Sequence, residues 1–173
     1  MMNGKHQLTT TIEVATASAA VWGILADSTL LPQWANVVKN VTYVAGAEVA
    51  EGSAEGVGMT RQCAVSFGGR EGSLTERCVE FVPGRRAGYV VVDDTLGFKR
   101  MLADYGFTLT LDPRPASGPA ERTTVRIDTY YTPRNPAYAL MNRLVLRQRM
   151  RMVAAELLQG LKRISERSAT TPA

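Results

Sequence analysis

The segment from Pro136 to about Arg167 carries the strongest periodic pattern in the chain. At about 100° per residue, one side of it collects an apolar stripe, made up of Leu146, Met150, Val153, Ala154, Leu157, Leu161 and Ile164. A helix of this length with one apolar face has to bury that face against another layer of structure. Arg143 and Arg147 lie beside the first half of the stripe, so the layer beneath that half must accept arginine.

The residues before this helix read mostly as strands. An alternating Thr- and Val-rich segment at 6–15 predicts the first strand, and two short helices at 16–27 and 28–35 follow it. Thr16 or Ser18 is the expected N-cap of the first helix, and Ser28 that of the second. Further strands are predicted between Gly- and Pro-rich turns, at 38–46, 58–67, 73–82, 87–95, 103–112 and 123–132, with a loop at 46–58.

This order of elements predicts an α+β fold. Strands joined by short hairpin loops pair antiparallel, which gives a curved seven-stranded sheet with the long helix across its concave face. The two short helices follow the first strand. A chain of 173 residues is expected to form one domain, 1–173, with frayed termini at 1–5 and 168–173.

Composition excludes several classes of function. The net charge of +4 is spread along the chain without a basic block interleaved with aromatic residues, so no nucleic-acid partner is expected. No apolar run is long enough for a membrane span, and the N-terminus has no apolar signal core, so the expected location is the cytoplasm. His6 is the only histidine, and no metal motif, P-loop or GxGxxG is present. We therefore expect neither a metal nor a cofactor.

Four stretches together resemble the helix-grip superfamily, which includes START-like proteins and the major birch-pollen allergen. They are ATASAAVWGILADSTLLPQWANVVKNVTYV, GVGMTRQCAVSFGGREGSLTERCVEFVPGRRAGYVV, YGFTLTLDP and LLQGLKRISE. Within that superfamily the chain looks most like the bacterial polyketide cyclase/dehydrase-like branch, over roughly residues 8–167. The resemblance implies a deep cavity between sheet and helix for lipids, sterols, polyketides or other hydrophobic molecules.

Function on such a fold depends on the pocket, so three functions stay open. The first is a polyketide cyclase or dehydratase of the aromatase type, working on an oxygenated hydrophobic substrate without a cofactor. The second is a carrier or sensor of a lipid-like, quinone or polyketide ligand. The third is a module that acts through protein contacts. Two or more ionisable or phenolic groups converging on the cavity favour catalysis, whereas a purely apolar cavity favours carriage.

Side-chain alternation selects the cavity-facing residues of the hairpin 58–82. Met59, Cys63, Val65 and Phe67 share one phase, and Thr75, Arg77, Val79 and Phe81 share another, and both phases are expected to face inward. This predicts Arg61 opposite Val79 and Cys63 opposite Arg77, and it places Cys63 and Cys78 on opposite faces, where they cannot form a disulfide.

Arg61 and Arg77 are the leading candidates for contact with a ligand oxygen or a developing oxyanion. The alternative is that each pairs with a carboxylate such as Asp93 or Asp104, or lies in solvent at a strand end. Arg61 is preferred, and its replacement by Ala or Met is expected to weaken ligand binding and to leave the fold intact.

Other candidates follow from alternation, from the helix stripe and from the resemblance. Tyr105 and Tyr131 are expected to present phenols to the cavity as hydrogen-bond donors or weak acids. Buried tyrosines often only satisfy backbone groups, and Trp34 is as well explained by packing. The remaining candidate ligand-binding residues are Trp34, Met59, Cys63, Tyr89, Phe107, Thr129, Arg143 and Leu146.

The outer side of the long helix is more apolar than a solvated face should be. Met141, Val145 and Met152 lie about opposite the core stripe, with Leu144 near its edge. Such a patch usually marks a contact surface, so residues 138–152 are a candidate homodimer or synthase-domain contact. The alternative is that neighbouring segments of the chain cover this face.

Overall fold

Seven strands form one antiparallel sheet, as the sequence predicted, and their order in the sheet is β1-β7-β6-β5-β4-β3-β2. The structure, a computed structural model, describes residues 2–44, 56–114 and 121–170. The predicted loop at 46–58 lies largely outside these residues. The strands are β1 (His6–Val14), β2 (Val38–Tyr43), β3 (Thr60–Phe67), β4 (Arg70–Val82), β5 (Arg86–Asp94), β6 (Leu102–Arg114) and β7 (Arg122–Pro133).

Helices occupy the predicted places, with one addition. After β1 come α1 (Ser18–Leu25), the 3-10 turn η1 (Ser28–Leu30) and α2 (Leu31–Trp34). The addition is α3 (Phe98–Met101), a single turn between β5 and β6. The C-terminal helix has three parts: α4 (Pro136–Met141), the π-helical turn η2 (Asn142–Leu146) and α5 (Arg147–Thr170).

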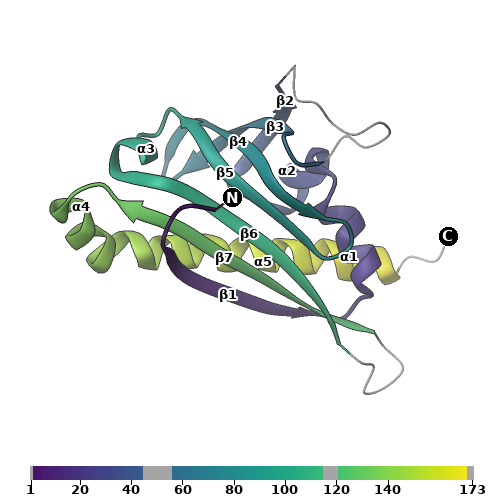
Figure 1. Ribbon diagram of the computed structural model, residues 1–173. Coiled ribbons are helices and arrows are strands. Elements are labelled where there is room, and N and C mark those ends of the chain that lie inside the picture. The colour runs from purple at the N-terminus through teal and green to yellow at the C-terminus, as the bar shows by residue number, and fades with distance from the viewer. Residues whose placement is uncertain (1, 45–55, 115–120, 171–173) are drawn as a thin grey trace.

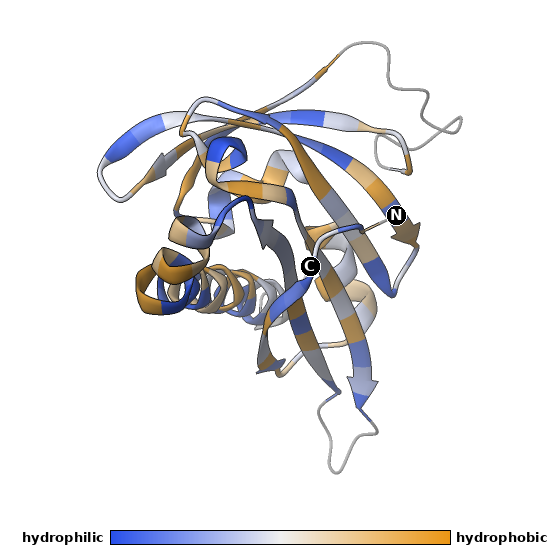
Figure 2. Cartoon of the chain, turned by 60° about the vertical axis from the view of Figure 1, so that its left-hand side comes forward, coloured by the Kyte–Doolittle hydropathy of each residue, from blue (hydrophilic) through white to orange (hydrophobic). Residues whose placement is uncertain are grey.

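The sheet curls around the C-terminal helix (Figure 1). At one end of the molecule lie α3 and α4, and at the other lie α1 and the last turns of α5. Apolar residues occur along both the strands and the C-terminal helix (Figure 2). The buried residues from both layers form a single core cluster, to which the helix contributes Leu146, Met150, Ala154, Leu158 and Leu161. The predicted stripe is therefore confirmed in outline.

The register of the β3–β4 hairpin differs from the prediction. Gly68 and Gly69 have φ of +58° and +78° and form a two-residue turn, as mirror-image hairpin turns require. Phe67 then pairs with Arg70, and this register places Arg61 opposite Glu76 and Cys63 opposite Leu74. The predicted partners, Val79 for Arg61 and Arg77 for Cys63, are therefore wrong.

A β-bulge explains why the phase of β4 was misread. Cys78 pairs with Tyr89 and Glu80 with Gly88, so Val79 is an extra residue in the ladder. One extra residue reverses the alternation. Before the bulge, Glu76 and Cys78 are the buried residues and Arg77 is exposed. After the bulge, Phe81 packs against the core. Cys63 and Cys78 are both buried on the inner face and remain thiols, so the expected absence of a disulfide is confirmed but its predicted reason is wrong.

The predicted helix caps are also corrected. The N-cap position of α1 is Ala17, whose side chain cannot cap, and the Thr16 hydroxyl points to the carbonyl of Ser165 instead. The first turn after α1 is capped by Asp27, which accepts a hydrogen bond from the Thr29 N–H. Ser28 is therefore not the cap, and it is completely buried.

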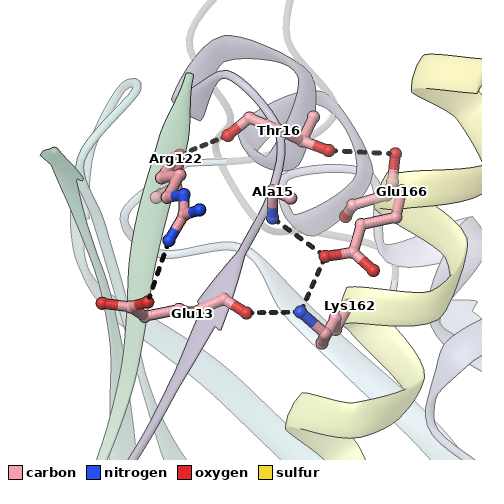
Figure 3. Close-up of polar contacts among 8 residues, drawn as sticks. Glu13, Ala15, Thr16, Arg122, Lys162 and Glu166 are labelled. Atoms are coloured by element: carbon pink, nitrogen blue, oxygen red, sulfur yellow. Dashed lines mark hydrogen bonds and ion pairs between the residues drawn. The ribbon is translucent and has the colours of Figure 1, made fainter. Parts of the chain in front are cut away.

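Polar contacts hold the C-terminal part of α5 to the sheet (Figure 3). Lys162 Nζ lies 2.7 Å from both the Glu13 carbonyl and Glu166 Oε1. The same Glu166 oxygen accepts a hydrogen bond from the Ala15 N–H at 2.9 Å. These contacts join the helix to the end of β1 and the residues that follow it.

Candidate ligand-binding site

A cavity of about 120 Å³ lies between the inner face of the sheet, α2 and α5. Its wall is mainly aliphatic and aromatic, which is typical of sites for hydrophobic small molecules. The lining residues are Leu31, Trp34, Ala35, Val37, Val38, Arg61, Cys63, Val65, Phe67, Leu74, Glu76, Leu96, Phe98, Tyr105, Phe107, Leu109, Ile127, Thr129, Met150, Val153, Ala154 and Leu157.

A buried ion pair forms the polar part of this wall. Arg61 on β3 and Glu76 on β4 are directly opposite in the ladder, and their exposed fractions are 2% and 6%. Arg61 Nε and Nη2 lie 2.9 and 2.8 Å from Glu76 Oε2. Among the described residues, the thiol of Cys63 also points to this oxygen, at 3.9 Å. The alternative that Arg61 pairs with a carboxylate is therefore confirmed, but the partner is Glu76 and not one of the suggested Asp93 and Asp104.

Two further contacts complete the environment of the Arg61 guanidinium. Nη1 donates to the Ser28 hydroxyl oxygen at 2.6 Å, and the guanidinium carbon lies 4.0 Å from the centroid of the Tyr89 ring. Burial lowers the pKa of Arg61, but the charge and hydrogen bond of Glu76, together with Tyr89 and Cys63, outweigh burial, so the pKa lies above its ordinary value. The guanidinium is thus permanently charged, and its charge is balanced inside the protein.

Tyr105 supplies the phenol of the cavity wall. Its ring stacks within an aromatic series in which Phe67, Phe98, Tyr105 and Tyr131 follow one another at centroid distances of 5.4, 6.0 and 6.2 Å. Burial raises the pKa of the Tyr105 phenol well above its ordinary value, and the charge of Glu76 adds to the effect. The phenol therefore stays protonated at neutral pH. Its hydroxyl lies 3.9 Å from the sulfur of Met150, which is a weak acceptor.

Tyr131 is committed to a structural contact. Its hydroxyl donates to Asn142 Oδ1 at 2.6 Å, and Gln7 Nε2 donates to the Tyr131 carbonyl at 2.8 Å. Asn142 is the first residue of the π-helical turn and is itself buried. Burial raises the pKa of Tyr131, so this phenol also stays protonated. Tyr131 thus fixes the helix to β7 and does not line the cavity, contrary to expectation.

The remaining predicted site residues fall into three groups. Trp34, Cys63, Phe107 and Thr129 line the cavity with Arg61 and Tyr105. Met59, Tyr89 and Leu146 are buried but lie outside its wall. Arg77 and Arg143 are exposed, so the expectation that they face the cavity is wrong. For Arg77 the cause is the bulge at Val79, and Arg143 follows Asn142 on the outer side of the π-helical turn.

Trp34 has an additional property. Its indole Nε1 is buried and has no hydrogen-bond acceptor among the residues that the structure describes. A buried donor without a partner costs about 1–3 kcal/mol. Trp34 thus borders the cavity, while its indole N–H is itself buried.

Sequence reasoning missed Glu76 and Ser28. Glu76 was assigned to the outer face because the phase of β4 was taken from Val79 and Phe81, beyond the bulge. The Gly68–Gly69 pair was the signal that could have found it, because a two-residue turn fixes Arg61 opposite Glu76. Ser28 had no comparable signal, since a serine before a helix is most simply explained as a cap.

Comparisons with known proteins agree with this architecture. The chain matches three solved structures over most of both chains, each at a sequence identity that shows the fold alone. The Zhui aromatase/cyclase of Streptomyces sp. R1128 has 17% identity and a TM-score of 0.64, over 92% of this chain and 95% of that one. A START superfamily protein of Mycobacterium smegmatis has 15% identity and a TM-score of 0.60, over 93% of this chain and 94% of that one. Major latex-like protein 151 of Panax ginseng has 13% identity and a TM-score of 0.61, over 91% of this chain and 95% of that one.

No curated protein matches the chain by sequence at a significant level. Within the described residues, no helix is both long and apolar enough to cross a membrane. The family model described as "Polyketide cyclase / dehydrase and lipid transport" matches residues 5–166. The fold is helix-grip, and the chain belongs to the polyketide cyclase/dehydrase and lipid transport family.

Proposed function

We propose that the protein binds a hydrophobic, oxygenated small molecule in the cavity and acts on it as a cytoplasmic polyketide cyclase/dehydratase of the aromatase type, without a cofactor. One observation carries the proposal: Arg61, Glu76 and Tyr105 converge on a wall that is otherwise almost entirely apolar. A purely carrying cavity has no need of a buried charge pair, whose desolvation costs several kcal/mol per ion. Membership of the family is consistent with such a ligand.

In the proposed chemistry, Glu76 acts as a base and Tyr105 as a hydrogen-bond donor. The Glu76 carboxylate takes a proton from a carbon between two carbonyls, and the resulting enolate carbon attacks a second carbonyl of the same chain. Tyr105 donates a hydrogen bond to the oxygen of that carbonyl as negative charge develops on it. The proton held by Glu76 returns to this oxygen, and the resulting hydroxyl leaves as water together with the remaining hydrogen of the attacking carbon, which forms the C=C bond of the dehydrated ring. The apolar wall contributes by holding the chain folded.

The test compares product distributions from a linear poly-β-ketone thioester, which also cyclises in solution without a protein. Wild-type protein is expected to shift the products towards one ring pattern. For Glu76→Gln, the initial rate at which this favoured product forms is expected to fall at least tenfold. Glu80→Gln is the matched control, because Glu80 lies on the same strand and pairs with Arg86 at the surface. Equal activity of Glu76→Gln and wild type would reject the role of Glu76. An unshifted product pattern with wild type would reject catalysis.

The alternative function is carriage or sensing of a lipid-like, quinone or polyketide ligand. One observation supports it: the Arg61 guanidinium already contacts Glu76, Ser28 and Tyr89, so the ion pair can have a structural role and take no part in chemistry. Native mass spectrometry of freshly purified protein tests it directly. A ligand that co-purifies unchanged, together with an unshifted product pattern, would select carriage.

A protein contact through residues 138–152 is part of the proposal. Leu140, Leu144, Val145 and Met152 are exposed, Leu144 by 68%. A synthase domain that delivers the substrate is the partner we propose for this surface, and a homodimer is the other possibility. Light scattering over a concentration series, for wild type and Leu144→Glu/Met152→Glu, tests both. A monomer in each case, with unchanged binding of the partner synthase, would reject the contact.

A further inference from the structure

A second hollow, of about 220 Å³, adjoins the cavity on its outer side. The β3–β4 turn, the segment from Leu96 to Met101 and the helix around η2 surround it. Its lining residues are Phe67, Gly68, Arg70, Leu96, Phe98, Met101, Met141, Val145, Leu146 and Arg149. We call it the outer hollow.

The two hollows have part of their walls in common. Phe67, Leu96 and Phe98 line both of them. The inner cavity alone is small compared with the roughly 300–1,000 Å³ of small-molecule sites. Together the two volumes reach the lower end of that range. A ligand of ordinary size therefore has to occupy both hollows, with its body between these three side chains.

The charges of the outer hollow are of one sign. Arg70 and Arg149 are its charged lining residues, and no carboxylate is among the residues that line it. Arg149 Nη1 lies close to the β3–β4 turn, 3.6 Å from where a Cβ on Gly68 would be. The nearby Asp94 carboxylate is occupied by the N–H groups of Phe98 and Lys99. The described part of the chain gives neither arginine an ion pair.

We propose that the outer hollow binds the anionic head of an amphiphilic ligand, a carboxylate or a similar oxyanion, through Arg70 and Arg149. The apolar body of the ligand then passes Phe67, Leu96 and Phe98 into the inner cavity. Guanidinium groups suit this role because their planar N–H donors match the geometry of a carboxylate. The inference rests on the proposed function and narrows its ligand class to acids with an apolar body.

Tryptophan fluorescence can report on both ends of such a ligand. Trp34 lines the inner cavity, so a heavy atom at the far end of the ligand will quench it. The probes are 11-bromoundecanoate and 11-bromoundecanol, used below their aggregation concentrations. They differ in the head group alone. Trp22→Phe in the full chain removes the other tryptophan signal.

Both probes are expected to quench Trp34, and the carboxylate to bind about tenfold more tightly than the alcohol, because charge-assisted hydrogen bonds to a guanidinium are stronger than neutral ones. Arg149→Gln and Arg70→Gln are each expected to remove most of this preference and to leave binding of the alcohol unchanged. Arg151→Gln is the matched control: it removes an exposed arginine from the same helix outside the hollow.

The outcomes separate this inference from the proposed function. If neither probe quenches Trp34, the cavity does not take ligands of this kind and the proposed function fails as well. Equal affinity for acid and alcohol would overturn the head-group site and leave the cavity function standing. A preference for the acid that Arg151→Gln weakens as much as Arg149→Gln does would also overturn it, because general charge attraction would then explain the preference.

Discussion

The two halves of the C-terminal helix cover different interiors. Towards its end, α5 lies on a filled core, where Leu158 and Leu161 are buried and Gly160 approaches the Trp34 carbonyl. Around Met150 and Val153 the same helix covers a cavity. An unfilled volume forfeits contacts that stabilise a protein, so it persists only where the rest of the structure supports it. The filled half supplies that support, and the hollow half is left available for a ligand.

The polar contacts of the two halves differ in the same way. At the filled end they are partly exposed, as with Lys162 and Glu166 in Figure 3. At the hollow end the charges of Arg61 and Glu76 are buried. Exposed pairs contribute little to stability, whereas breaking a buried pair leaves a charge without compensation. Variants at the two ends of the helix, and titration with alkali, can test this contrast.

Arg61→Met is expected to lower the free energy of unfolding at pH 7 by about 3–5 kcal/mol, because it leaves the Glu76 carboxylate buried and unpaired. This revises the expectation from the sequence that the fold stays intact. Urea denaturation measures the change. The double variant Arg61→Met/Glu76→Leu is expected to regain most of the loss. If the double variant is no more stable than Arg61→Met, the unpaired Glu76 carboxylate is not the cause of the loss and the contrast between the two ends does not hold.

Gly160→Ala is expected to destabilise the filled end by about 3 kcal/mol, the upper part of the range for overpacking. A Cβ at this position would lie 1.8 Å from the Trp34 carbonyl oxygen, so the backbones of α5 and α2 have to separate. Gly23→Ala is the matched control. Within the described residues, and apart from the neighbouring backbone of α1, no atom lies within 4 Å of a Cβ there, and alanine in α1 should stabilise by about 1 kcal/mol. Similar melting temperatures for Gly160→Ala and wild type would show that this junction is loosely packed.

The two tyrosines at the hollow end are expected to make the protein sensitive to alkali. Burial raises the pKa of Tyr105 and of Tyr131 above the ordinary value of about 10. The unfolded chain therefore loses these protons first, and stability falls as the pH rises above about 10, by roughly 1.4 kcal/mol per pH unit for each phenol. Absorbance at the phenolate band, followed with circular dichroism, measures this. Ionisation of all tyrosines before any unfolding would contradict the burial of both phenols.

Much of the fold was predictable from the sequence because its signals are local. The period of the segment 136–167 predicted the long helix, and the Gly- and Pro-rich turns delimited every strand of the sheet to within a few residues. The single turn α3 was missed, since four residues are too few to show a period. The π-helical turn was missed for a similar reason: one extra residue per turn hardly disturbs the apolar stripe.

The site was less predictable because it depends on which residues meet across strands. Trp34, Arg61, Cys63, Tyr105, Phe107 and Thr129 were placed correctly on the cavity wall. Arg77 was not, because one bulge residue inverts the face of everything before it. Glu76 was lost by the same error, although it is the group that decides whether Arg61 is an anchor for a ligand or half of an ion pair. Alternation is thus reliable only within an unbroken stretch of ladder.

Lys162→Met at the filled end is expected to cost less than about 1 kcal/mol at pH 7, since both charges of this pair are about one third exposed and are screened by water and salt. The hydrogen bond from Lys162 lowers the pKa of Glu166, with a further contribution from the Ala15 N–H. The contribution of Glu166 to stability is therefore present above its unfolded pKa of about 4.3 and is lost as the pH falls through the lower folded value. Urea denaturation of wild type and Lys162→Met between pH 7 and pH 3 should show the two stabilities converging at the acid end. A cost at pH 7 as large as that of Arg61→Met would mean that these exposed contacts, rather than the apolar packing beneath them, hold the filled half of the helix to the sheet.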